Sequence, residues 1–137
     1  MVTSGQPLML AVSINPQNYS NQLVREAGEF VIAFPTVGQG PAVWYCGSHS
    51  GRDVDKIAHT GLELMPAAEI RTPLLRGAVA NFECRLVQQM DVGDHTLFVG
   101  EVVAAHVEDD APGRLVNFGD NRYALAEIVP GTLYEAR

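Results

Sequence analysis

The segment from residue 46 to residue 56, CGSHSGRDVDK, concentrates side chains that could hold an anionic ligand. Gly51 permits close approach of a ligand to the backbone, and the neighbouring serine hydroxyls can donate hydrogen bonds. The Arg52 guanidinium can bind a phosphate through two N–H groups at once, and Lys56 could add a second positive charge. The spacing therefore indicates a phosphate-binding loop, although a capped loop with an exposed Arg52–Asp53 pair would explain the same residues.

Two short helices are expected to present their first turns to such an anion. Ser20 and Asn21 open a helix over residues 20–27 that Gly28 ends, and a second helix is expected over residues 53–60. The first N–H groups of a helix lack intrahelical partners and lie at the positive end of its dipole. Both helix starts thus favour phosphate binding.

Other chemistry in the chain is less well supported by the residues. The string Gly47 to Gly51 has His49 where a Gly-x-Ser-x-Gly hydrolase elbow requires serine. Cys46 is either a redox thiol or, more commonly for such a residue, a small buried apolar group. His95 follows Gly93-Asp94 at a turn and is either a functional imidazole or a polar turn residue. Four scattered histidines and two scattered cysteines predict no metal site.

Composition limits the class of protein. The 137 residues fit a single domain over 1–137, and 47% apolar residues can form a core without disulfides. A net charge of −7 argues against nucleic acid and anionic membranes as partners, because both are bound mainly through lysine and arginine. The start of the chain has no signal-peptide pattern, so a cytoplasmic location is expected.

The pattern of apolar residues predicts a mainly β fold with two or three short helices. From Ala78 to Leu86 every even position is apolar, as in a half-buried strand, and the turn at 91–94 predicts a hairpin with the next strand. We expect strands over residues 7–14, 29–34, 62–65, 74–75, 78–86, 96–107 and 123–128, and helices over residues 20–27, 41–45 and 53–60. Many short strands with few helices suit a small barrel.

Five segments, in order, resemble the flavin reductase-like and flavoredoxin family, whose fold is the FMN-binding split β-barrel. These are residues 8–16 ending in SINP, Tyr19-Ser20 with Gly28-Glu29-Phe30-Val31, the segment 45–56 with its CG-x-x-SGRD-x-DK pattern, the hairpin residues 81–86 and 93–102, and Asn121-Arg122-Tyr123. Two departures accompany the resemblance. The chain starts just before the core strand, so the family's N-terminal strands are expected to be absent, and Asn117 stands where relatives often have histidine.

The resemblance implies a homodimer that binds FMN and transfers hydride from NAD(P)H to it, as an NAD(P)H:flavin reductase. It places His95 on the nicotinamide side as the candidate catalytic residue. The candidate cofactor-binding residues, from spacing and resemblance together, are Ser20, Asn21, Cys46, Gly47, Ser48, Ser50, Gly51, Arg52 and Lys56. Two alternatives stay open: a flavoredoxin-type FMN electron carrier, and a non-catalytic dimeric split-barrel protein that has lost flavin binding.

Overall fold

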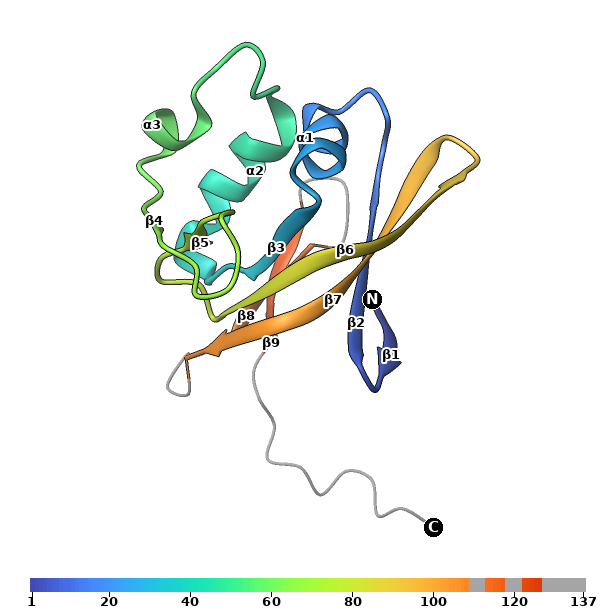
Figure 1. The fold of residues 1–137 in the computed structure, drawn as a ribbon. Coiled ribbons are helices and arrows are strands. Elements are labelled where there is room, and N and C mark those ends of the chain that lie inside the picture. The colour runs from blue at the N-terminus through green and yellow to red at the C-terminus, as the bar shows by residue number, and fades with distance from the viewer. Residues whose placement is uncertain (109–112, 118–121, 127–137) are drawn as a thin grey trace.

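The computed structural model describes residues 1–108, 113–117 and 122–126 (Figure 1). Its main element is a five-stranded antiparallel sheet with the strand order β1-β2-β7-β6-β3. The strands are β1 (Val2–Gly5), β2 (Leu8–Ile14), β3 (Glu29–Phe34), β6 (Ala80–Val92) and β7 (His95–Val107). Two further antiparallel pairs join β4 (Leu64–Met65) to β5 (Leu74–Leu75) and β8 (Arg114–Asn117) to β9 (Tyr123–Ala126).

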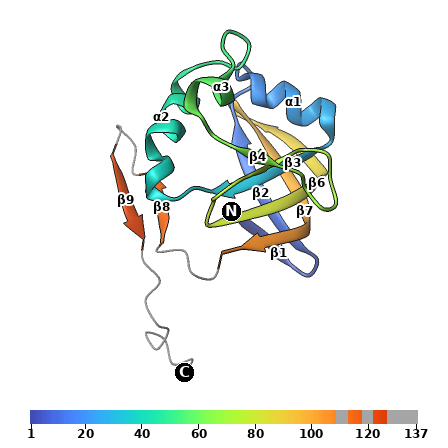
Figure 2. The same cartoon turned by 90° about the vertical axis from the view of Figure 1, so that its left-hand side faces the viewer.

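Three α-helices in the described residues gather at one end of the sheet, as the two views show (Figures 1 and 2). They are α1 (Tyr19–Ala27), α2 (Gly40–Ser48), which follows the 3₁₀ turn η1 (Val37–Gln39), and α3 (Lys56–Thr60). Within the described residues, every helix falls short of the length and apolar character needed to cross a bilayer. These sheets and short helices confirm the predicted mainly β fold class.

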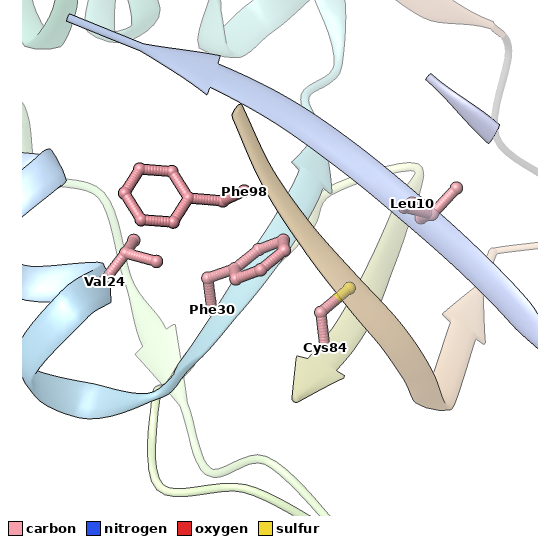
Figure 3. Close-up of a cluster of buried hydrophobic side chains, with 5 residues drawn as sticks. All are labelled: Leu10, Val24, Phe30, Cys84 and Phe98. Atoms are coloured by element: carbon pink, nitrogen blue, oxygen red, sulfur yellow. The ribbon is translucent and has the colours of Figure 1, made fainter. Parts of the chain in front are cut away.

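The core lies between the sheet and α1 (Figure 3). Side chains of one strand face meet there, because alternate residues of a strand point to the same side. Its centre is formed by the buried residues Leu10, Val24, Phe30, Cys84 and Phe98. Gly100 lies at its tightest point, where an added Cβ would be 2.7 Å from the Phe30 ring and 2.8 Å from Cys84 Cβ.

The predicted strands over 29–34 and 74–75 are confirmed with the expected bounds, and the predicted hairpin is β6–β7. Strand β6 is longer than expected. Two register shifts, between Glu83 and Cys84 and between Leu86 and Gln88, interrupt its pairing with β7. A bulge inserts one residue and reverses which face later residues occupy. The period-two pattern therefore ends at Leu86 although the strand continues to Val92.

Two strands were missed by the pattern of apolar residues. β1, of sequence VTSG, pairs with β2 at the edge of the sheet, in a segment where the sequence predicts no strand. The absence of the family's N-terminal strands stays a prediction. The sequence also predicts no strand for β8, which pairs with β9 while Leu115 N–H donates to Pro35 O. Both strands are four residues long, too short for a period to show. Residues 127–128 of the strand predicted over 123–128 lie outside the described residues.

The segment from residue 68 to residue 72 is held by two carboxylates of the main sheet. Glu83 on β6 accepts the N–H groups of residues 68, 69 and 70 at 2.8–3.2 Å, and Glu29 on β3 accepts those of residues 71 and 72 at 2.8 Å. Glu83 is fully buried, and its Oε1 lies 2.7 Å from His106 Nε2 on β7. Five consecutive backbone N–H groups are thus satisfied by two side chains.

Candidate functional site

A groove of about 1000 Å³ opens between the start of α1 and the segment that joins α2 to α3. Its walls are residues 17–20, Leu23 and residues 46–57. Eight of the nine candidate cofactor-binding residues line it: Ser20, Cys46, Gly47, Ser48, Ser50, Gly51, Arg52 and Lys56. The fold thus brings two segments, about thirty residues apart in sequence, to one site.

The helices around this groove begin and end at other residues than the sequence predicts. α2 continues to Ser48 instead of ending at Tyr45. Among residues 40–48 the only proline is Pro41, in the first turn of the helix, where proline is tolerated, and no helix-breaking residue follows it before Gly47. α3 begins at Lys56, because Asp55 is its N-cap and accepts the N–H of Ala58 at 3.0 Å. Cys46, Gly47 and Ser48 therefore end one helix and do not lead into the next.

The segment between α2 and α3, residues 49–55, is a turn closed on itself. The carbonyl oxygen of Ser50 accepts the N–H groups of Asp53 and Val54 at 3.1 and 3.2 Å. The Ser50 hydroxyl oxygen accepts the N–H of Arg52 at 3.2 Å. We call these seven residues the phosphate loop, after the ligand that the sequence predicts for this segment. Its internal hydrogen bonds give it a defined shape from which the Arg52 side chain projects.

The Arg52 side chain connects the phosphate loop to the start of α1. Its guanidinium lies 4.7 Å from the centre of the Tyr19 ring and donates to Gln17 O at 3.3 Å and to Gln22 Oε1 at 2.8 Å. A cation over an aromatic face is electrostatically favourable. A guanidinium has five N–H donors, more than these two hydrogen bonds use, so Arg52 is held in place with donors left for an anion.

The start of α1 forms the opposite wall. The N-cap residue Asn18 makes no hydrogen bond from its side chain to the helix, so the first N–H groups gain no side-chain partner there. Ser20 adds a hydroxyl in the first turn. Gly51 comes close to this wall, because an added Cβ would lie 3.4 Å from Tyr19 Cδ1. The start of α1 and the phosphate loop therefore line the same groove.

Lys56 and Ser48 are both engaged with the end of α2. The Lys56 ammonium donates to Cys46 O at 2.5 Å, and the Ser48 hydroxyl donates to Trp44 O at 2.9 Å. A cation at a helix C-terminus is stabilised by the negative end of the dipole. Lys56 therefore ties α3 to α2 while lining the groove.

Asn21, predicted as a cofactor-binding residue, does not line the groove. It is buried, its Nδ2 donates to Ile14 O at 3.1 Å, and its Oδ1 accepts from Arg25 Nε at 2.9 Å. Nη2 of Arg25 donates hydrogen bonds to Thr96 Oγ1 and to Asp91 Oδ1, at 3.0 Å each. Asn21 thus connects α1 to β2 and, through Arg25, to the β6–β7 hairpin, and direct contact with a cofactor stays a prediction.

His95 lies at the first position of β7, at the hairpin turn, and outside the residues that line the groove. Its Nδ1 is 2.7 Å from Asp94 Oδ1, and its side chain is partly exposed. The structure therefore does not bring His95 to the phosphate loop. Its assignment to the nicotinamide side stays a prediction.

The two cysteines differ in environment. Cys46 lines the groove and is partly exposed, whereas Cys84 is fully buried in the core. Burial disfavours the charged thiolate and raises the pKa of Cys84 to about 11. Among the described residues, no three histidine, cysteine, aspartate or glutamate side chains gather as a metal site.

Sequence reasoning missed two residues of this site, Gln17 and Gln22. Both hold the Arg52 guanidinium, one through its backbone and one through its side chain. Glutamine carries no signal by itself. Only the location of Arg52, which the sequence does not give, could have suggested Gln22.

A sequence model of a known family, described as the flavin reductase like domain, matches residues 1–126. The chain belongs to this family. An uncharacterized protein of Archaeoglobus fulgidus is 39% identical to the flavin reductase-like chain over 100 residues, which cover 73% of this chain and 56% of that protein. A ferric-chelate reductase (NAD(P)H) of the same organism is 32% identical over 111 residues, covering 79% and 63%. The chain thus spans less than two thirds of the length of these relatives.

Solved structures of similar proteins share the fold. An FMN-binding protein from Thermus thermophilus with bound p-hydroxybenzaldehyde has 33% identity and a TM-score of 0.84, covering 96% of this chain and 77% of that one. A flavoredoxin from Methanosarcina acetivorans has 28% identity and a TM-score of 0.83, covering 97% and 76%. The flavin reductase-like chain therefore has the split-barrel fold that the resemblance implied, and that prediction is confirmed.

Proposed function

We propose that this flavin reductase-like chain binds FMN and acts as an NAD(P)H:flavin oxidoreductase. The observation that carries the proposal is the meeting of Arg52, the phosphate loop and the first turn of α1 in one groove. A guanidinium, serine hydroxyls and a helix N-terminus are the donors that phosphate groups take in proteins. The FMN-binding relative and the ferric-chelate reductase support flavin and NAD(P)H as ligands.

The residues on both sides of the groove would hold the ribityl phosphate. Arg52 would bind phosphate oxygens, Ser20 and Ser50 would donate their hydroxyls, and Gly51 would let the backbone approach closely. Lys56 adds positive charge to the same wall. Bound FMN would supply the hydride chemistry itself, so the chain has only to orient the ring and admit nicotinamide.

The second candidate function is that of an FMN electron carrier. The flavoredoxin of similar fold supports it, because a carrier keeps its flavin and needs no nicotinamide site. A third possibility, a split-barrel protein without flavin, would leave the groove without a ligand. The same donor set fits the first two functions, and turnover distinguishes between them.

Purification and titration with FMN test the proposal. A flavin absorbance spectrum or saturable quenching of flavin fluorescence is expected, followed by NAD(P)H oxidation that rises with added free flavin and saturates. Tight FMN binding without such turnover would favour the carrier. The absence of FMN binding at millimolar flavin would contradict both.

The homodimer that the resemblance implies is part of the proposal, and one surface favours it. β3 pairs with β6 only from Ala80 to Arg85, so the outer edge of the rest of β6 faces no strand in the described residues. That stretch exposes about half of each of three apolar side chains, Val87 at 53% and Met90 and Val92 at 52%. An apolar open edge favours association.

A further inference from the structure

The ring of Tyr45 on α2 lies between two imidazoles. The His49 ring is 4.0 Å from it at an interplanar angle of 19°, and the His59 ring is 3.9 Å away at 8°. His49 directly follows α2, and His59 is in the last turn of α3. The three rings therefore form one stack that joins the two helices, and neither Tyr45 nor His59 lines the groove.

This stack acts on both ends of the phosphate loop. His49 is the first residue of the loop, and His59 belongs to the helix that follows it. The Lys56–Cys46 hydrogen bond adds a second link between the same helices. The hydrogen bonds that Ser50 accepts from residues 52, 53 and 54 connect the middle of the loop to its start.

We propose that the Tyr45 stack positions the phosphate loop, and that His59 is a positioning residue for Arg52. The inference rests on the proposed function, because the position of Arg52 matters to ligand binding only if the groove takes a phosphate. Contact between aromatic rings stabilises a structure beyond the area it buries. The stack sets how far α3 lies from the end of α2, and this separation sets where the loop presents Arg52 against Tyr19.

The test compares His59→Ala with His59→Phe. Alanine removes the ring that stacks on Tyr45, whereas phenylalanine keeps an aromatic face without the imidazole nitrogens. Hydrogen exchange of residues 49–55, followed by mass spectrometry in the absence of flavin, reports loop order. FMN titration then reports ligand affinity. Arg71→Ala is the control, since it removes a side chain that is 84% exposed and lies on another loop.

We expect His59→Ala to speed exchange in the loop and to weaken FMN binding by about 2- to 10-fold, the scale of one aromatic pair. His59→Phe should restore both, and Arg71→Ala should change neither. Unchanged exchange in His59→Ala, or a phenylalanine variant that behaves like alanine, would overturn the proposal. If the unmodified chain binds no FMN, the proposed function fails, while the exchange measurement still decides the role of the stack.

Discussion

At the scale of single residues, Arg52 links the two walls of the groove. Its guanidinium stacks on Tyr19 and bonds to Gln17 and Gln22, all of them near the start of α1. Gln22 is itself oriented by Glu26, which accepts a hydrogen bond from its amide at 2.7 Å. Ordering an arginine before its ligand arrives lowers the entropy cost of binding. Arg52 is therefore the residue whose removal should affect ligand binding most directly.

Arg52→Ala should weaken FMN affinity by about 1–3 kcal/mol, the range for a hydrogen bond to a charged group. Arg52→Lys should recover only part of the loss, because an ammonium lacks the planar fork of the guanidinium. Flavin fluorescence titration measures both. Arg71→Ala is the matched control, since that side chain is 84% exposed and lies on another loop. Equal affinity in Arg52→Ala and the unmodified chain would remove Arg52 from the site.

Gly100→Ala should destabilise the protein by about 1–3 kcal/mol, the usual cost of overpacking a core. The added methyl group would meet Cys84 Cβ on the neighbouring strand β6 and the Phe30 ring on β3, the strand beyond it, and both residues are buried. Urea unfolding followed by far-UV circular dichroism measures the loss. Gly5→Ala is the control, because an added Cβ there meets nothing within 4 Å. A Gly100→Ala variant as stable as the unmodified chain would show that the core can shift to admit the methyl group.

At the scale of elements, the segment 68–72 depends on Glu83 and Glu29 remaining charged. Burial by itself raises the pKa of each carboxyl. For Glu83, the hydrogen bonds from the N–H groups of residues 68 and 69 and from His106 outweigh the effect of burial. For Glu29, the hydrogen bonds from Thr72 and Arg71 outweigh it. The pKa of each carboxyl therefore lies below its ordinary value. Because the pKa is lower in the folded state, each carboxylate stabilises the fold at pH values above the pKa of the unfolded chain, near 4.5. This stabilisation is lost as the pH falls through the pKa of the folded state.

Glu83→Gln should destabilise the protein at pH 7 by about 1.5–3 kcal/mol, because a neutral amide replaces a charged acceptor of several hydrogen bonds. The variant should also lose less stability than the unmodified chain between pH 5 and the acid transition. Urea unfolding at a series of pH values tests both points. Glu69→Gln serves as the control, since its contact with Arg85 is a half-exposed pair at 3.8 Å. Parallel pH curves for Glu83→Gln and the unmodified chain would contradict the assignment.

At the scale of the whole molecule, the groove is lined by residues of α1, α2, α3 and the phosphate loop. His95 and the open edge of β6 instead belong to the β6–β7 hairpin (Figure 1). The net charge of −7 means that the proposed anionic flavin would be bound against the average field of the protein. Local donors must therefore supply the attraction, as the groove does.

Light scattering coupled to size exclusion should give twice the chain mass of 14.8 kDa. The double variant Met90→Lys with Val92→Lys should shift the protein toward the monomer, because two charges would be buried without partners at the proposed interface. Val107→Lys is the control: that side chain is 59% exposed at the opposite end of β7. An unmodified chain that elutes as a monomer at high concentration would exclude the homodimer.

The sequence by itself determined the features that depend on neighbouring residues. Alternation of apolar residues predicted the hairpin of β6 and β7, the turn residues bounded β3, and the segment 46–56 indicated an anion site. These signals are local, because side-chain direction along a strand repeats every two residues and a loop motif is continuous in the chain. The same continuity made the family resemblance visible.

Only the tertiary structure decided which of these residues meet. Arg52 and Gln22 are thirty residues apart and come together because α1 and the phosphate loop pack at the same end of the sheet. In the fold, Asn21 is buried and His95 lies at the hairpin turn, outside the residues that line the groove. Such contacts arise from packing between elements distant in sequence, and no local pattern of residue types encodes them.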